Sequence, residues 1–360
     1  MNLTDYLRFL LFPLALIYGV VIGIRNWLYD HRWLRSVSFE FPVISVGNLS
    51  YGGTGKTPHV EYLIRLLSGQ NRVTTLSRGY RRKTSGFKIA DNRPNVNDLG
   101  DESTLLKLKF PHVNVTVGES RVLAIPQILS TLPQTDVILL DDAFQHRSVE
   151  PGLSILLTSY PRLYTDDYLL PIGTLREFRG SATRANFIVV TKCPLNLNTV
   201  ERERIRNEIK PIDNQLLFFS YIRYYHAYSI TNPGDRIEPN KNLDIVLFSG
   251  LAFDEELNEY LSAKSRNVYP LQYSDHHNYD RVDIENITEA FQNIDSTNKI
   301  LLTTEKDAVK LYEHKEWILS KQLPLYILPI QVDFFPEDKS LFDTQVTGYL
   351  NRLKQHRKIR

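Results

Sequence analysis

Residues 50–57 read Ser-Tyr-Gly-Gly-Thr-Gly-Lys-Thr, the spacing of a phosphate-binding loop, except that Ser50 takes the place of the usual first glycine. Glycines let successive backbone amides point at phosphate oxygens, at the start of a helix whose dipole favours negative charge. We expect Lys56 to reach the β- and γ-phosphates and Thr57 to ligate Mg²⁺. The predicted nucleotide-binding residues are Ser50, Tyr51, Gly52, Gly53, Thr54, Gly55, Lys56 and Thr57.

A pair of carboxylates, Asp141 and Asp142, follows the apolar run 137–140. In nucleotide-binding sheets a carboxylate at the end of such a strand holds the magnesium ion. The alternative is a strand that simply leaves the core into a polar turn. Gln145 and His146 extend the polar cluster from the same strand end.

A basic turn, Arg78 to Lys83, follows the apolar run 73–76. In a doubly wound sheet this turn lies at the same edge as the phosphate loop, where it could bind a phosphorylated substrate. A solvated run of charges is the alternative.

Apolar strand-like runs alternate with segments of helical period along the chain. Strands are expected at 42–46, 73–76, 114–117, 137–140, 153–157 and 187–190, with helices near 121–129 and 200–209. This alternation predicts an α/β fold, a doubly wound sheet of the P-loop NTPase type. After a Tyr-rich stretch with Pro, Gly and Asn, a second and smaller α/β domain begins with a strand at 245–248.

The predicted organisation has five parts. They are a membrane anchor with a basic flank at 1–35, the kinase domain at 36–222, a linker at 223–242, the second domain at 243–345 and a basic tail at 346–360.

The N-terminal segment lacks any charged residue from Phe9 to Ile24. Its sixteen residues extend about 24 Å as a helix, short of the roughly 30 Å hydrocarbon core of a bilayer. A span, a shallow monotopic anchor and a buried core helix therefore all remain open. Arg25, Arg32 and Arg35 outnumber Arg8, which by the positive-inside rule places the bulk of the chain in the cytoplasm.

Composition narrows the classes of function. The 43 basic and 41 acidic residues give a net charge of +2, so no general binding to nucleic acid is expected. One cysteine, Cys193, permits no internal disulfide and fits a reducing compartment. No obligate protein partner is expected.

Seven motifs, in order, make the sequence resemble the lipid A disaccharide kinase (tetraacyldisaccharide 4'-kinase) family. They are the segments 47–58, 77–80, 100–102, 141–146, 175–177, 275–277 and 303–307, which together cover nearly the whole chain. Ala143 departs from the glycine expected there, a change of one methyl group.

The resemblance implies an enzyme of the bacterial inner membrane, facing the cytoplasm, that uses ATP and Mg²⁺. It would phosphorylate the 4'-hydroxyl of a tetraacylated glucosamine disaccharide 1-phosphate, which makes lipid IVA, and it would contact membrane lipid. Asp101 matches the family's catalytic base and His276 the histidine that pairs with it, while Lys56 also counts as catalytic. The predicted metal ligands are Thr57, Asp141, Asp142 and Glu177, and the predicted substrate contacts are Arg78, Glu102, Arg121, Gln145, His146 and Arg176.

Two other functions remain to be compared. A regulatory NTPase at the membrane would share the phosphate loop, but segment 191–194, Thr-Lys-Cys-Pro, lacks the Asn and Asp of a guanine-reading motif. A soluble kinase or ligase for a small polar substrate would instead use the N-terminal segment as a core helix.

Overall fold

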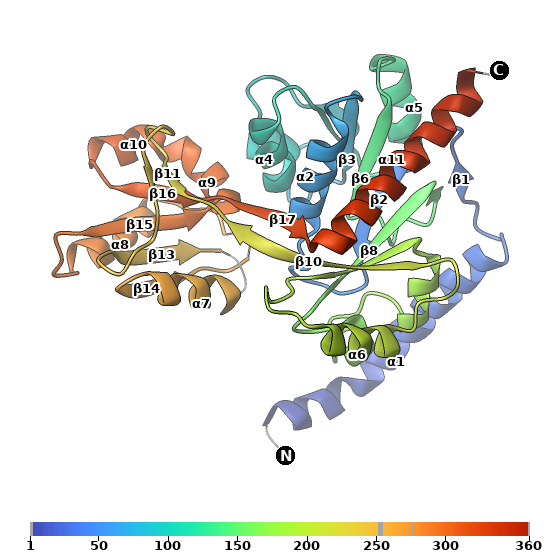
Figure 1. Cartoon of the computed structure of the whole chain (residues 1–360), viewed down its shortest axis with the longest axis horizontal. Coiled ribbons are helices and arrows are strands. Elements are labelled where there is room, and N and C mark those ends of the chain that lie inside the picture. Colours follow the sequence, from blue (N-terminus) through green and yellow to red (C-terminus); the bar gives the residue numbers. More distant parts are fainter. Residues whose placement is uncertain (1–2, 251–254, 276, 359–360) are drawn as a thin grey trace.

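Two β-sheets, each built mainly from parallel strands, organise the computed structural model, which describes residues 3–250, 255–275 and 277–358 (Figure 1). The first sheet has nine strands in the order β17-β10-β9-β8-β2-β6-β3-β5-β4, and only the edge strands β17 and β4 run antiparallel to their neighbours. Its strands are β2 (Val43–Asn48), β3 (Val73–Ser77), β4 (Lys88–Ile89), β5 (Asn114–Val117), β6 (Val137–Asp141), β8 (Leu153–Ser159), β9 (Phe187–Thr191), β10 (Leu216–Tyr224) and β17 (Ile330–Phe334).

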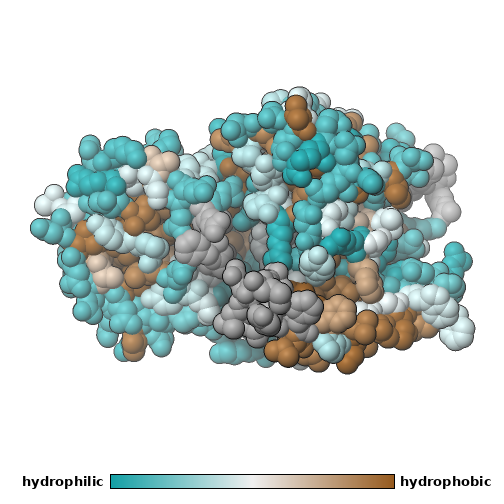
Figure 2. Space-filling view, turned by 90° about the horizontal axis from the view of Figure 1, so that it is seen from below, coloured by the Kyte–Doolittle hydropathy of each residue, from teal (hydrophilic) through white to brown (hydrophobic). Residues whose placement is uncertain are grey.

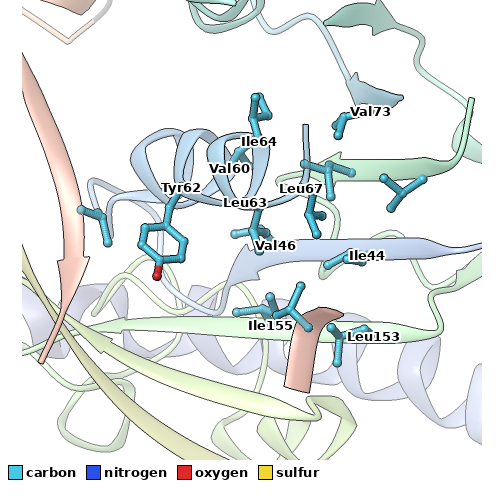
Figure 3. Close-up of a cluster of buried hydrophobic side chains, with 14 of the residues drawn as sticks. Ile44, Val46, Val60, Tyr62, Leu63, Ile64, Leu67, Val73, Leu153 and Ile155 are labelled. Atoms are coloured by element: carbon cyan, nitrogen blue, oxygen red, sulfur yellow. The ribbon is translucent and has the colours of Figure 1, made fainter. Parts of the chain in front are cut away.

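Helices cover both faces of this sheet because its central strands are apolar on both sides. In β6, Val137 and Leu139 join the core on one face, and Ile138 and Leu140 join the core on the other. The first core includes side chains of α2 (Lys56–Leu67), α4 (Asp101–Lys109) and α11 (Pro336–Lys358), and Figure 3 shows α2 over β2 and β8. On the opposite face lie α5 (Arg121–Thr131) and α6 (Thr199–Ile209).

The second sheet has six strands in the order β12-β11-β16-β15-β13-β14. Its strands are β11 (Ala227–Ser229), β12 (Arg236–Ile237), β13 (Asp244–Ser249), β14 (Asn267–Gln272), β15 (Lys299–Thr304) and β16 (Leu325–Leu328). Its helices are α7 (Glu255–Lys264), α8 (Arg281–Gln292), α9 (Glu305–Leu311) and α10 (Lys315–Ser320). The remaining short elements of the chain are β1 (Val37–Ser38), β7 (Val149–Glu150), α3 (Val96–Leu99), η1 (Tyr164–Asp166), η2 (Arg179–Arg184) and η3 (Tyr312–His314).

The chain crosses between the two sheets twice, at adjacent places. It leaves the first sheet at the end of β10 and returns at the start of β17, where Tyr224 is paired with Ile330. The structure therefore places 330–334, expected in the second domain, in the first sheet, and it places β11 and β12, within the expected linker, in the second sheet. Local periodicity in the sequence cannot predict that β17 pairs with β10, because the two strands are about a hundred residues apart in the chain.

The segment expected as a basic tail, 346–360, lies up to Lys358 in helix α11. Val346 and Leu350, four residues apart on one helical face, are buried in the core that also contains β2 and β8. Lys354 hydrogen-bonds Asn71 at 2.5 Å. This helix therefore completes one face of the nine-stranded sheet.

Helix α1 (Leu3–Asp30) is long and apolar enough to cross a membrane, and no other helix in the described chain meets those criteria. Its C-terminal half nevertheless lies against the protein: Tyr18 donates a hydrogen bond to the Arg176 carbonyl at 2.8 Å, and Asn26 is 8% exposed. The other face carries exposed apolar side chains, and Figure 2 shows a hydrophobic band on the underside of the molecule. These side chains are Leu10, Phe12, Leu14, Leu16, Ile17, Val20, Val21, Ile24 and Trp27.

The buried side chain of His59, in α2, leads to a prediction about how the stability of the fold depends on pH. Its Nδ1 lies 2.7 Å from the Gly55 carbonyl oxygen, which can only accept, so Nδ1 carries the proton and Nε2 accepts from Ser220 at 3.0 Å. Burial lowers the pKa of His59 from 6.5 to about 4. Between pH 6.5 and about pH 4, His59 is therefore protonated in the unfolded chain and neutral in the folded chain.

We expect this difference to destabilise the fold as pH falls through that window, by on the order of 3 kcal/mol in total. His59→Gln cannot titrate, so the gap in unfolding free energy between the parent and the variant should shrink from pH 7.5 to pH 4.5. Urea titrations at several pH values measure the gap, and a constant gap would contradict the assignment.

Candidate active site

The predicted phosphate loop, residues 50–57, connects β2 to α2 and has the backbone that its glycines permit. Gly52 has φ +119° and Gly55 has φ +81°, both in the region that side chains disfavour, and open space surrounds Gly52 and Gly53. Gly55 caps α2 without a side-chain hydrogen bond, and the first turn of α2 contains no acidic residue. The N-terminus of α2 can therefore receive an anion.

Side chains outside the glycine motif fix this loop. Asn48, at the end of β2, donates a hydrogen bond to Thr54 Oγ1 at 2.7 Å, and Thr191 Oγ1 donates to the Thr54 carbonyl at 3.0 Å. The Tyr51 amide donates to the Thr174 carbonyl at 2.6 Å, and Ser50 forms a bridge to Leu175. Sequence reasoning gave no role to Asn48, although its place between a buried strand and the loop was a usable signal.

The two carboxylates lie beside the loop because β2 and β6 are neighbouring parallel strands with Val46 paired to Asp141. Close contact between the two strand ends is possible only because residue 47 is glycine: a Cβ there would lie 2.7 Å from the Phe144 Cβ. The structure thus places Asp141 and Asp142, the predicted metal ligands, beside the loop.

The negative charge of Asp142 is balanced by Lys56 of the loop and by Arg176, which lies 34 residues further along the sequence. Arg176 donates to both carboxylate oxygens, at 2.8 and 3.1 Å, and also to the Asn48 side chain. Lys56 Nζ lies 3.9 Å from Asp142 Oδ2. Burial opposes ionisation of Asp142, but Lys56 and Arg176 outweigh it and lower the pKa of this carboxyl.

Asp141 has the opposite environment. Its carboxylate is buried, and neither oxygen has a hydrogen-bond partner among the residues that the structure describes. Burial, followed by the charges of Glu102 and Asp142, raises its pKa. A buried carboxylate without donors is costly unless a cation joins it, so Asp141 fits a magnesium ligand.

Cations surround these carboxylates. Arg121, which is 1% exposed, donates to the Gly118 carbonyl at 3.1 Å and to the Asp141 carbonyl at 3.4 Å. Burial, with Arg121 and Arg78 nearby, lowers the pKa of His146 to about 4. His146 is therefore neutral near pH 7, and Arg78, Arg121 and His146 belong to one cluster.

Gln145 links this cluster to the strand end and to helix α1. Its side chain donates to the Asn48 carbonyl at 2.9 Å, and its own carbonyl accepts from Arg25 at 2.6 Å.

Asp101 begins α4 and is 4% exposed. It faces α9 of the second sheet, where Lys310 Nζ lies 3.8 Å from its Oδ2. Its neighbour Glu102 lies 4.0 Å from Lys306 Nζ, and the charge of Glu102 also acts on Asp141. The N-terminus of α4 therefore lies between the phosphate-loop edge and α9.

His276, predicted to pair with Asp101, lies outside the described residues. The next residue, His277, has its Nε2 2.7 Å from Asp283 Oδ2, at the start of α8.

Glu177, predicted as a metal ligand, is fully buried against helix α1. It accepts hydrogen bonds from Arg184 at 2.8 Å and from Asn26 at 3.2 Å, and Arg25 lies 3.9 Å away. The described residues contain no group of three or more His, Cys, Asp or Glu side chains arranged to hold a metal ion. The structure thus shows Glu177 in contact with helix α1 and next in sequence to Arg176.

A large cavity of about 1030 Å³ lies elsewhere, lined by residues that follow α1 and by the 143–152 loop. Its lining combines Arg32, Arg35, Arg147 and Arg184 with apolar side chains. Because neither Lys56 nor Asp141 lines it, we place the candidate active site at the loop and not in this cavity.

Comparison with known proteins shows the family of the chain over nearly its full length. The model of the tetraacyldisaccharide-1-P 4'-kinase family matches residues 7–351. The chain belongs to this family. A tetraacyldisaccharide 4'-kinase of Flavobacterium johnsoniae is 46% identical over 348 residues, which cover 96% of this chain and 98% of the relative. The Bacteroides thetaiotaomicron enzyme of the same name is 40% identical over 353 residues, 94% of this chain and 92% of the relative.

A solved structure of the same family shares the fold. The crystal structure of LpxK from Aquifex aeolicus in complex with ATP matches with a TM-score of 0.70 and 28% identity, over 96% of this chain and 99% of that one. The expected α/β class with parallel sheets is confirmed, as is the family that the sequence resembled.

The buried pair Glu177–Arg184 gives a stability prediction. Arg184→Met leaves the Glu177 carboxylate with Asn26 and the more distant Arg25, and should cost on the order of 3 kcal/mol. The double variant with Glu177→Gln should recover much of this loss because the unpaired charge is gone. Urea unfolding in detergent measures both variants. Arg204→Met, which breaks only the two surface pairs with Glu201 and Glu208, is the control and should change little.

Proposed function

We propose that this protein transfers the γ-phosphate of ATP to the 4'-hydroxyl of tetraacyldisaccharide 1-phosphate, forming lipid IVA in lipid A biosynthesis. Membership of the kinase family supports the activity. The observation that supports the chemistry is the meeting of three elements: the phosphate loop, the carboxylates after β6, and the N-terminus of α4.

The proposed nucleotide site is the loop 50–57 of a doubly wound, P-loop-type sheet. Backbone amides at the start of α2 receive the phosphates, and Lys56 moves from Asp142 toward the β- and γ-phosphate oxygens. Arg176 keeps Asp142 paired when Lys56 leaves it.

Magnesium binds with ATP in this proposal, and Asp141 and Thr57 are its protein ligands, with Asp142 beside them. The unpartnered, buried oxygens of Asp141 support this choice. When bound, Mg²⁺ neutralises charge that builds up on the phosphates. Glu177 was also predicted as a ligand, but its hydrogen bonds to Arg184 and Asn26 favour a role in fixing the adjacent Arg176.

Asp101 is the proposed catalytic base. The oxygen of the 4'-hydroxyl attacks the γ-phosphorus, its proton passes to the Asp101 carboxylate, and the bond to the β-phosphate oxygen breaks to release ADP. Arg78, Arg121, Gln145 and His146 lie around the same strand ends and are the proposed contacts of the acceptor, with Glu102 beside the base.

Helix α1 gives the proposed membrane attachment. Its exposed face is apolar, while Tyr18, Arg25 and Asn26 bind it to the catalytic part of the chain. A helix held along the protein surface suits a monotopic anchor better than a free span, because the attached protein would have to enter the hydrocarbon. We place the enzyme on the cytoplasmic face of the inner membrane.

The deciding experiment follows label from γ-labelled ATP with purified, detergent-solubilised protein, with and without the lipid A disaccharide 1-phosphate acceptor. Labelled disaccharide is the expected product. Phosphate release that does not depend on the acceptor, without labelled lipid, would instead indicate a regulatory NTPase.

Lys56→Met should lower label transfer by about 100-fold or more, because the transition state loses its loop cation. Thermal unfolding should be close to that of the parent, since Lys56 is partly exposed and its only described ion pair is long. Undiminished transfer by a folded Lys56→Met enzyme would refute the loop assignment.

Membrane attachment is tested by two charges on the exposed face of α1. Val20→Glu with Ile24→Glu replaces side chains that are 53% and 55% exposed and four residues apart. We expect binding to anionic lipid vesicles to fall at least about tenfold, because carboxylates are costly in hydrocarbon. Val200→Glu, on α6 and 78% exposed, is the matched control and should still float with the vesicles. Equal flotation of both variants would show that this face of α1 does not bind lipid.

A further inference from the structure

The second sheet presents two lysines of α9 to the start of α4. Lys306 and Lys310 are four residues apart on one face of α9, and α4 packs against this helix (Figure 1). Lys306 is near Glu102 and Asp275, whereas Lys310 is near Asp101 and Asp307. The two lysines differ in burial: the Lys310 side chain is 4% exposed and that of Lys306 is 20% exposed.

Lys310 is a buried cation without a hydrogen-bond partner among the described residues. Its Nζ lies 3.8 Å from Asp101 Oδ2 and 3.8 Å from Asp307 Oδ1, and both carboxylates are at most 5% exposed. Both distances exceed a hydrogen bond, so the ammonium acts on Asp101 as a point charge. In a buried site such a charge is screened little by solvent.

Asp307 holds the lysine in place from its own helix. Its Oδ2 accepts from Thr304 Oγ1 at 2.8 Å, and its Oδ1 accepts from the Gly250 amide at 3.2 Å. Thr304 is the last residue of β15 and Gly250 is the residue after β13, so the ends of the two central strands of the second sheet set the position of Asp307.

We propose that Lys310 is a positioning residue for the catalytic base: with Asp307 as its support, it keeps the Asp101 carboxylate anionic and directed into the site. This inference rests on the proposed role of Asp101. In this proposal, segment 303–307 and the residues just after it place the positive charge of Lys310, which belongs to the second sheet's helix α9, next to the catalytic base Asp101 on the first.

The electrostatic surroundings agree with this role. Burial lowers the pKa of Lys310, and Asp307 and Asp101 oppose that effect. The other charged groups that face this pair are Glu102 on α4, Lys306 on α9 and Asp275 in the loop before α8. Lys306 lies beside Glu102 and Asp275, and its charge also acts on Asp101, whereas the Nζ of Lys310 lies 3.8 Å from Asp101 Oδ2.

A purely structural role is the alternative, since Lys310 also joins α4 to α9. The chain supplies a matched control. Lys109 of α4 joins the same two helices: its Nζ lies 2.8 Å from Glu305 of α9 and 2.7 Å from Glu61 of α2. Lys109→Met therefore removes a lysine from the same helix contact without touching Asp101.

The test is the pH dependence of kcat for label transfer, measured on the full chain in detergent at saturating ATP and acceptor. Without the nearby cation, Asp101 holds its proton to higher pH. In Lys310→Met the acidic limb of the profile should therefore move up by about one to three pH units. KM for ATP should stay within about twofold of the parent value. Lys310→Arg keeps the positive charge, so its acidic limb should lie close to that of the parent. Lys109→Met should lower the melting temperature and leave the limb in place.

The proposal is overturned if the acidic limb stays in place in Lys310→Met, or if Lys109→Met shifts it equally.

Asp101→Asn separates this proposal from the proposed function. A loss of about 10²- to 10⁴-fold in turnover for Asp101→Asn supports the base. If that loss occurs and the Lys310 variants leave the limb unmoved, only the role of Lys310 fails. If Asp101→Asn retains turnover and its pH profile keeps the same acidic limb, the assignment of Asp101 as the base itself fails.

Discussion

The pairing of β2 with β6 is the constraint on which the site depends. Val46 lies opposite Asp141 in a parallel ladder, so the phosphate loop and both carboxylates emerge side by side. Gly47 lets the loop after β6 approach closely enough for Asp142 to reach Lys56. All other parts of the site, including Arg176, Arg121 and the start of α4, are arranged around a position that this register fixes.

Charge burial distinguishes the two carboxylates, although they are adjacent in sequence. Asp142 is compensated within the protein by Arg176 and Lys56, whereas Asp141 is buried with no donor among the described residues. Ionisation of Asp141 is therefore unfavourable in the folded state, although the charges of Lys56 and Arg121 act on it. In the proposed function, a bound cation would relieve this cost, and the relief would contribute to its affinity.

Local sequence predicted the buried strands well, since apolar runs bounded by turn residues identify them; strand β5 has the expected bounds, 114–117. The motif at 50–57 predicted the loop from local sequence for a similar reason: all of its residues are consecutive. The return of 330–334 to the first sheet and the approach of Lys310 to Asp101 depend instead on tertiary pairing. Helix α1 was visible as an apolar run, but its attachment through Tyr18 and Asn26 was not.

The double crossing between the sheets has a consequence for synthesis on the ribosome. Edge strand β17 and helix α11 follow all strands of the second sheet in the sequence. Most strands of the first sheet are therefore made early, but this sheet lacks an edge strand and part of one face until the second sheet has been made. The second sheet is made in between, with both its ends joined to an unfinished neighbour. A chaperone that shields exposed strand edges would be needed most during that interval.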